Sequence, residues 1–261
     1  MRIAAAQIAC TLGDLGANLA KIRDFSSRAK EAGADLIVFP EMSDTGYAMP
    51  VIREHAKSWT EGAVPELQKL AEDLSLAIIC GVSERDGPSI YNSQVFVDAK
   101  GGIIGRYRKT HLFGPAPIEE HTCFAPGAEL TGLEFGGFQF GLSICYDLRF
   151  PEVYRTLAIK KRASVFIISS AWPFPRVEHF RILAAARAIE NQSYVVVSNR
   201  VGTDNGISFC GSSAIIDPYG ERVASGSADR EELVQGEISA AVLDSVRNRM
   251  PIFADRRTDL Y

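Results

Sequence analysis

The first half of the chain alternates short apolar runs with segments of helical spacing. Leu19, Ile22 and Phe25 recur at the spacing of one helix face, and Gly33 follows as a stop signal. Short runs rich in Ile, Val and Phe predict buried strands, and the turn at residues 98–102 predicts a hairpin. The predicted strands cover residues 3–8, 36–39, 77–80, 91–97 and 103–107, and the predicted helices cover 19–32 and 65–74.

The second half begins with a loop rich in Pro and Gly at residues 114–127 and then resumes the alternation. From Phe138 to Ile144, bulky residues alternate with small or polar ones, which predicts a strand ending at Cys145. Pro151 suits the first turn of a following helix. The later pattern predicts strands at 165–168, 194–197 and 233–238, a helix at 178–189 and a hairpin turn at 217–220.

Units in which a helix follows a strand therefore coexist with two hairpins. A purely parallel sheet needs no hairpin, so the pattern predicts an α/β fold with mixed sheets and helices outside. Neither a low-complexity linker nor a clear internal repeat divides the 261 residues. We therefore expect one domain covering residues 1–261.

The overall composition excludes several classes of function. The chain is 46% hydrophobic and 23% charged with a formal net charge of −4, which is typical of a globular protein. Its basic residues are scattered, so no nucleic-acid partner is expected. It contains no apolar stretch long enough to span a bilayer. The first residues carry one positive charge but no long apolar region, which favours a cytoplasmic location.

The cysteines and histidines give little support to a disulfide framework or a metal site. The five cysteines are odd in number, widely spaced and without a C-x-x-C, and the four histidines form no H-x-x-x-H pair. Cys10 and Cys80 lie in strand-like runs and are expected to be small buried side chains. The pattern leaves Cys123 and Cys210 undecided. No metal and no cofactor are therefore predicted.

Three reactive residues each come directly after a predicted strand, where loops of α/β proteins carry sites. Glu41 follows an apolar run, and desolvation there would raise its pKa toward that of a general base. Lys109, if buried, could stabilise an oxyanion and lower the pKa of a nearby thiol. Cys145 lies at a strand-to-helix turn whose free N–H groups suit a developing negative charge. Taken singly, each residue has an ordinary structural explanation: a solvated Glu, a surface Lys or a buried Cys.

Other residues near these motifs offer alternatives. A Cys–His pair of Cys145 with His111 or His179 would make a papain-like hydrolase, but neither histidine has a recognisable orienting context.

Three charged residues follow Cys145 closely. Asp147, Arg149 and Glu152 fit an ion-pair network that braces the turn better than direct chemistry. Arg149 could instead hold a substrate carboxylate in a bidentate grip.

Together, the motifs F-P-E with Glu41, R-K-x-H-L with Lys109 and C-Y-D-L-R-F-P-E from Cys145 resemble the nitrilase superfamily of carbon–nitrogen hydrolases. The resemblance implies an αββα sandwich, with two mixed sheets packed face to face and helices outside. It also implies that Cys145 is the nucleophile, Glu41 the general base and Lys109 the oxyanion stabiliser. The likeness extends over nearly the whole chain, to residues 187–192, 217–220 and 256–261.

The same resemblance suggests assisting residues. Glu120, seven residues before Gly127, matches a second glutamate that helps to place substrate or water in this family, although a solvated loop carboxylate is the alternative. The backbone N–H of Tyr146 would share the oxyanion with Lys109. Trp172 lies where family members line the substrate pocket, unless it is simply a core aromatic.

The motif after the nucleophile favours the amidase branches. True nitrilases resemble C-W-E, whereas this chain has Cys145-Tyr146-Asp147 and lacks a long C-terminal extension. It is most similar to the group of ω-amidase and deaminated-glutathione amidase, which implies a small linear amide as substrate, such as a dicarboxylate monoamide. Hydrolysis of N-carbamoyl compounds or of nitriles is the alternative. A non-catalytic binding protein is a third, against which the intact Glu–Lys–Cys set argues. Family members commonly pair near the helix predicted at residues 151–159, so a homodimer or larger assembly is expected.

Overall fold

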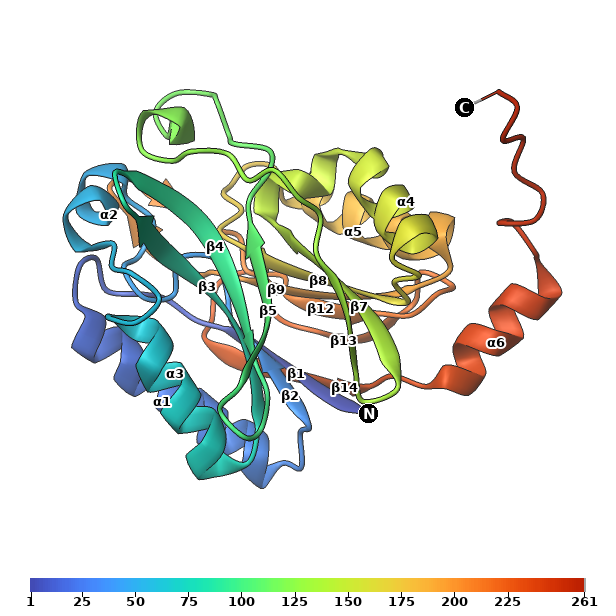
Figure 1. Cartoon of the computed structure of the whole chain (residues 1–261), viewed down its shortest axis with the longest axis horizontal. Coiled ribbons are helices and arrows are strands. Elements are labelled where there is room, and N and C mark those ends of the chain that lie inside the picture. Colours follow the sequence, from blue (N-terminus) through green and yellow to red (C-terminus); the bar gives the residue numbers. More distant parts are fainter. Residues whose placement is uncertain (261) are drawn as a thin grey trace.

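Two six-stranded sheets pack face to face, and helices cover their outer faces (Figure 1). The computed structural model describes residues 1–260, so Tyr261, the last residue of the terminal motif, lies outside the described residues. Side chains from both sheets form one buried core, which includes Ile3 and Val38 from the first sheet and Phe140 and Ile167 from the second. The αββα sandwich implied by the sequence is confirmed.

The first sheet is built largely from the N-terminal half of the chain. Its central strands run parallel, and the flanking strands pair antiparallel. The residues of β1 alternate between the two faces: Ile3 and Ala5 enter the core between the sheets, whereas Ala4 and Ala6 pack under the helices. In spatial order the strands are β14 (Glu232–Glu237), β1 (Arg2–Gln7), β2 (Leu36–Val38), β3 (Ala77–Asp86), β4 (Ser89–Val97) and β5 (Ile103–Arg108).

The second sheet repeats this mixed arrangement with the C-terminal half. Strands β7, β8 and β9 are parallel, and antiparallel strands lie on both sides of them. The turn at residues 217–220 joins β12 to β13, as predicted. In spatial order the strands are β13 (Arg222–Ser225), β12 (Ala214–Ile216), β9 (Tyr194–Asn199), β8 (Val165–Ser170), β7 (Phe138–Ile144) and β6 (Gly132–Phe135).

The helices form the two outer layers. Helices α1 and α3 cover the first sheet, and α4 and α5 cover the second (Figure 1). The Asp14 carboxylate caps α1 by accepting the N–H of Ala17 at 2.9 Å, and Pro151 opens α4. The helices are α1 (Leu15–Glu31), α2 (Met49–His55), α3 (Ala63–Leu74), α4 (Pro151–Lys160), α5 (Val177–Asn191) and α6 (Ala240–Arg249), with 3₁₀ turns at η1 (Glu120–Thr122) and η2 (Cys145–Arg149).

The predicted elements are present, and the differences concern short or peripheral ones. Helix α2, helix α6, strand β6 and the small hairpin of β10 (Thr203–Asp204) and β11 (Ile207–Ser208) were not predicted. A Gly-containing strand of four residues such as β6 carries too little pattern to stand out. Among residues 1–260, no helix is both long enough and apolar enough to cross a membrane.

Candidate active site

Each of the three predicted reactive residues lies just beyond the end of a strand. Glu41 follows β2, Lys109 follows β5 and Cys145 follows β7. The first two belong to one sheet and Cys145 to the other, so the site forms where the ends of the two sheets meet. All three are buried: Glu41 is 0% exposed, Lys109 1% and Cys145 7%. Because both side chains are buried, Glu41 and Lys109 are not the solvated surface residues that the sequence also allowed.

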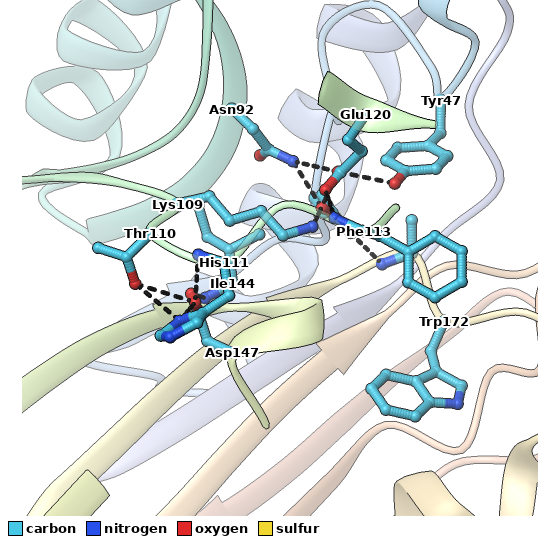
Figure 2. A network of polar contacts seen from close by, with 12 residues as sticks. Tyr47, Asn92, Lys109, Thr110, His111, Phe113, Glu120, Ile144, Asp147 and Trp172 are labelled. Atoms are coloured by element: carbon cyan, nitrogen blue, oxygen red, sulfur yellow. Dashed lines mark hydrogen bonds and ion pairs between the residues drawn. The ribbon is translucent and has the colours of Figure 1, made fainter. Parts of the chain in front are cut away.

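The centre of the site is a lysine held between two carboxylates (Figure 2). The ammonium of Lys109 donates to Oε1 of Glu41 and to Oε1 of Glu120, at 2.8 Å each. The amide of Asn92 donates to the same two oxygens at 2.6 and 3.1 Å, and the hydroxyl of Tyr47 donates to Glu120 at 2.7 Å. Glu120 is therefore a member of the buried cluster and not a solvated loop residue.

Backbone N–H groups fix both carboxylates from the other side. The N–H of Ala171, just after β8, donates to Oε2 of Glu41 at 2.8 Å. The N–H of Phe113 donates to Oε2 of Glu120 at 2.6 Å. Each carboxylate thus accepts hydrogen bonds at both oxygens, which compensates for part of the cost of burying its charge.

Burial and the surrounding charges shift the pKa of each reacting group. Desolvation raises the pKa of Glu41, against the opposing attraction of Lys109. Desolvation also raises the pKa of Cys145 well above that of a free thiol, and the charge of Glu41 adds to this while Lys109 opposes it. Burial alone would lower the pKa of Lys109, but attraction by Glu120 and Glu41 outweighs it, so the pKa is raised and the ammonium stays charged. Burial thus favours the protonated form of the Cys145 thiol beside the Glu41 carboxylate.

Cys145 occupies a strained backbone turn. Its φ angle of 43° lies in the left-handed region, which costs an ordinary residue roughly 1–2 kcal/mol. The turn is stabilised by Asp147, whose carboxylate accepts the N–H of Ile144 at 2.9 Å. This geometry presents the thiol at the start of η2, in the manner of a nucleophile elbow.

A small pocket opens onto the Cys145 thiol. Its empty volume is about 290 Å³, including its open mouth. Predicted residues Tyr146, Arg149 and Trp172 line it, which places Trp172 both in the pocket wall and against the core ring of Phe180. The other lining residues are Tyr47, Phe113, Ile118, Ala171, Pro173 and Arg176.

Two arginines give this pocket a positive wall. The Arg149 guanidinium lies 4.7 Å from the ring centre of Trp172, and that of Arg176 lies 5.5 Å from the ring centre of Phe113. Burial, with a further contribution from Arg176, lowers the pKa of Arg149. Within residues 1–260 neither guanidinium forms an ion pair with a carboxylate, so the wall is suited to an anionic group of a ligand.

The contacts of Asp147 differ from the predicted ion-pair network. Its carboxylate accepts hydrogen bonds from the side chains of Tyr107 and Thr110 and pairs with His111, whereas Arg149 faces the pocket and Glu152 is exposed. The brace exists, but it is built from the segment around Lys109. That partnership is non-local, so the spacing of charges along the chain could not reveal it.

The histidines do not form a Cys–His pair. His111 contacts the Asp147 carboxylate at 2.9 Å, and His179 lies 3.4 Å from Arg149. In the described part of the chain, neither histidine is hydrogen-bonded to Cys145. The geometry gives no support to the papain-like alternative.

Of the remaining cysteines, Cys10, Cys80 and Cys210 are buried and Cys123 is partly exposed; all are free thiols. Among residues 1–260, no group of three or more His, Cys, Asp or Glu side chains is arranged to hold a metal ion.

A larger cleft of about 910 Å³ lies elsewhere on the molecule. His55, Lys57 and Trp59 are among its lining residues, and it contains none of the predicted catalytic groups. The smaller pocket is the candidate site because a buried nucleophile and its charged neighbours converge there.

Among the site residues that the sequence did not predict are Asn92, Tyr47 and Arg176. Asn92 did carry a signal, because it begins a run of three polar residues within a strand that the structure buries. A buried polar run needs partners, and for Asn92 these are the two carboxylates. Tyr47 and Arg176 lie in irregular segments whose position no local pattern determines.

Comparison with known proteins identifies the family. The carbon-nitrogen hydrolase family matches residues 2–248, so the chain belongs to that family. It is 38% identical over 242 residues to a 2-oxoglutaramate amidase of Bacillus subtilis, covering 92% of each protein. It is 35% identical over 254 residues to a nitrilase of Pyrococcus abyssi, covering 94% of this chain and 92% of that protein.

Solved structures show the same fold. An amidase from Nesterenkonia sp. superposes with a TM-score of 0.87 at 29% identity, covering 100% of this chain and 94% of that one. Another structure of that amidase shows covalent addition of the acetamide moiety of fluoroacetamide at its active-site cysteine.

We predict that Gly81→Ala displaces Glu41. A Cβ at Gly81 would lie 2.5 Å from the carbonyl oxygen of Pro40 and 2.6 Å from Cα of Glu41, both backbone atoms. Overpacking of this kind typically costs about 1–3 kcal/mol, and a misplacement of about 1 Å costs on the order of 10²-fold in rate. The melting temperature Tm and kcat should both fall. Gly16→Ala, on α1 with no such contact, is the control, and equal activity of the two variants would contradict the prediction.

The raised pKa of Glu41 predicts an acid limb in the pH profile. If Glu41 accepts the proton of Cys145, as the sequence predicts, then kcat/KM should decline as the pH falls through this pKa and Glu41 becomes protonated. Because burial raises the pKa, the midpoint should lie above the ordinary glutamate value of about 4.3. Circular dichroism at each pH checks that the protein stays folded. A midpoint at or below that of a solvated glutamate would refute this.

Proposed function

We propose that the protein is an amidase that hydrolyses a small linear amide through a thioester on Cys145. The observation that carries the proposal is the buried Lys109 ammonium between Glu41 and Glu120, beside a cysteine at a strained turn that opens onto a small pocket. Membership of the carbon–nitrogen hydrolase family and likeness to solved amidases support it.

In the first half-reaction, the Cys145 sulfur attacks the amide carbon while Glu41 removes the thiol proton. The raised pKa of the thiol makes this base necessary, because little free thiolate exists near neutral pH. Negative charge grows on the amide oxygen, and Lys109 with the N–H of Tyr146 stabilises it. Removing one such donor typically costs about 3–4 kcal/mol. Glu41 then returns the proton to the amide nitrogen, and ammonia leaves.

In the second half-reaction, Glu41 takes a proton from a water molecule that attacks the thioester, and the proton passes to the departing sulfur. Glu120 assists through Lys109, which it holds at 2.8 Å, and through Tyr47 on the pocket wall. No metal or organic cofactor takes part in these steps.

The substrate we propose is a dicarboxylate monoamide. Its far carboxylate would lie against Arg149 and Arg176, which have no carboxylate partner within the described residues, and its chain would pack against Trp172. The pocket is narrow, which favours a short chain. The likeness to a 2-oxoglutaramate amidase supports this choice over N-carbamoyl compounds.

Assembly and location stay predictions. A homodimer or larger assembly through the face near α4, and a cytoplasmic location, remain as expected from the sequence. The partner that we propose for the site is the amide substrate.

A trapping experiment tests the proposed function. During amide turnover, hydroxylamine should intercept the thioester as a hydroxamate, and mass spectrometry of a quenched reaction should show the acyl group on Cys145. Cys145→Ala should be folded and inactive, and Glu41→Gln should lower mainly kcat. The matched nitrile should turn over far more slowly than the amide. Full activity of a folded Cys145→Ala protein would disprove the mechanism, and equal amide and nitrile rates would disprove the amidase assignment.

The positive wall predicts a charge-specific effect. For a monoamide such as succinamate, Arg149→Gln and Arg176→Gln should each lower kcat/KM by about 10–100-fold, the equivalent of about 1.5–3 kcal/mol for a hydrogen bond to a charged group. For neutral butyramide the change should be within about twofold of wild type. Arg181→Gln, on α5 and outside this pocket, is the control. Equal losses of kcat/KM on both substrates would show that the arginines do not bind a substrate carboxylate.

A further inference from the structure

One buried carboxylate near the site has no role in the steps above. Asp147 is 0% exposed, and its two oxygens gather five contacts at 2.7–3.1 Å. Oδ2 accepts from the hydroxyl of Tyr107 and the N–H of Ile144. Oδ1 accepts from the hydroxyl of Thr110 and the N–H of His111, and it also contacts Nδ1 of His111. Figure 2 shows most of this group beside the Lys109 cluster.

These partners come from both sheets. Tyr107 is in β5, at the edge of the first sheet, and Ile144 is the last residue of β7 in the second sheet. Lys109 follows Tyr107 by two residues, and Cys145 follows Ile144 directly. A single carboxylate therefore ties the backbone that carries the proposed oxyanion donor to the backbone that carries the nucleophile.

We propose that Asp147 is a positioning residue that sets the placement of Lys109 relative to the Cys145 thiol across the boundary between the two sheets. The inference rests on the proposed function, because it assigns Lys109 the oxyanion. Asp147 itself touches no reacting atom. It acts through Lys109 on one side and through the strained turn of Cys145 on the other.

The contacts suit a carboxylate side chain. Four of the five come from O–H or N–H donors, and two acceptor oxygens are needed to receive them all. In the described residues Asp147 has no Lys or Arg partner. His111, stacked on Phe150 at 3.9 Å between ring centres, is the one ionisable side chain besides Tyr107 that contacts it.

Other contacts fix the remaining members of the site independently. Glu41 is anchored by Asn92 and by the N–H of Ala171. The N–H of Lys109 donates to the carbonyl of Asn92 at 2.8 Å. This contact lies within the first sheet and does not reach Cys145. Loss of an Asp147 contact should therefore change the relation of Lys109 to Cys145 and leave the base in place.

Two buried tyrosines offer a matched test. Tyr107→Phe removes the hydrogen bond to Asp147 and, with it, the contacts of the Tyr107 hydroxyl with the hydroxyl and the N–H of Thr110 at 3.0 and 3.3 Å. Tyr154→Phe removes one hydrogen bond to Ser143 of β7 at 2.9 Å, within the second sheet and its helix, and so crosses no boundary. Both variants should stay folded and lower Tm by about 2–4 °C for each kcal/mol lost, with the larger loss in Tyr107→Phe because it removes more contacts.

The two variants should differ in catalysis. In Tyr107→Phe, kcat should fall at least about tenfold with KM within about twofold, since a misplacement of about 1 Å costs on the order of 10²-fold. The alkylation rate of Cys145 by iodoacetamide should fall in parallel. Tyr154→Phe should keep both rates within about twofold of wild type. Equal losses in the two variants, or unchanged rates in Tyr107→Phe, would overturn the proposal.

A double-mutant cycle identifies the route of the effect. In a Lys109→Met background, Tyr107→Phe should lower the alkylation rate no further, because the group it positions is absent. A full additional loss there would overturn the proposal. Thr110→Val is a second variant on the Lys109 side and should behave as Tyr107→Phe does. Asp147→Asn, if folded by circular dichroism, should show the largest loss, since its amide N–H₂ would face other donors.

The alkylation readout separates this inference from the proposed function. If the wild-type protein hydrolyses no amide but the Tyr107 and Tyr154 variants still differ in alkylation, the function fails and the positioning role stands. If amides are hydrolysed and the two variants do not differ, the positioning role fails alone.

Discussion

The ammonium of Lys109, buried between two carboxylates, is the interaction on which the site depends. Taking three charges out of water costs several kcal/mol each unless every one of them is paired and hydrogen-bonded. The structure meets that condition with the amide of Asn92 and with backbone N–H groups on Glu41 and Glu120. Once these donors are committed, the cluster has almost no freedom to rearrange, and the rigidity that burial demands is the same rigidity that a preorganised catalytic site needs.

The sandwich architecture supplies the members of this cluster from separate places. Parallel strands in each sheet end at the same edge, so residues that follow β2 and β8 meet across the interface, as Glu41 and Ala171 do. The hydroxyl of Ser169 adds a second tie by donating to the carbonyl of Phe39 at 2.7 Å. Close approach is possible because Gly81 has no side chain at the point where the backbone before Glu41 crosses β3. Catalytic geometry is therefore a consequence of sheet packing.

The sequence predicted those features that local pattern or motif determines. Alternating residues located β7 and so the turn at Cys145, and apolar runs located β2 and therefore Glu41. The motifs, through family resemblance, grouped these with Lys109 and Glu120. The sequence could not show contacts between segments far apart. Examples are Asn92 on both carboxylates, Arg176 on the pocket wall, and Asp147 with Tyr107 in place of Arg149 or Glu152. Such pairings depend on how the sheets dock, which no short window of sequence encodes.

Strand β14 joins the two ends of the chain, and this has a consequence for folding. It pairs with β1 at the edge of the first sheet, and Gln7 bonds to Glu232, 225 residues later. During synthesis, β1 therefore waits with an unpaired edge until almost the whole chain has left the ribosome. Contacts so distant in sequence are slow to form. The first sheet therefore keeps an open edge beside β1 until β14 is available to pair with it.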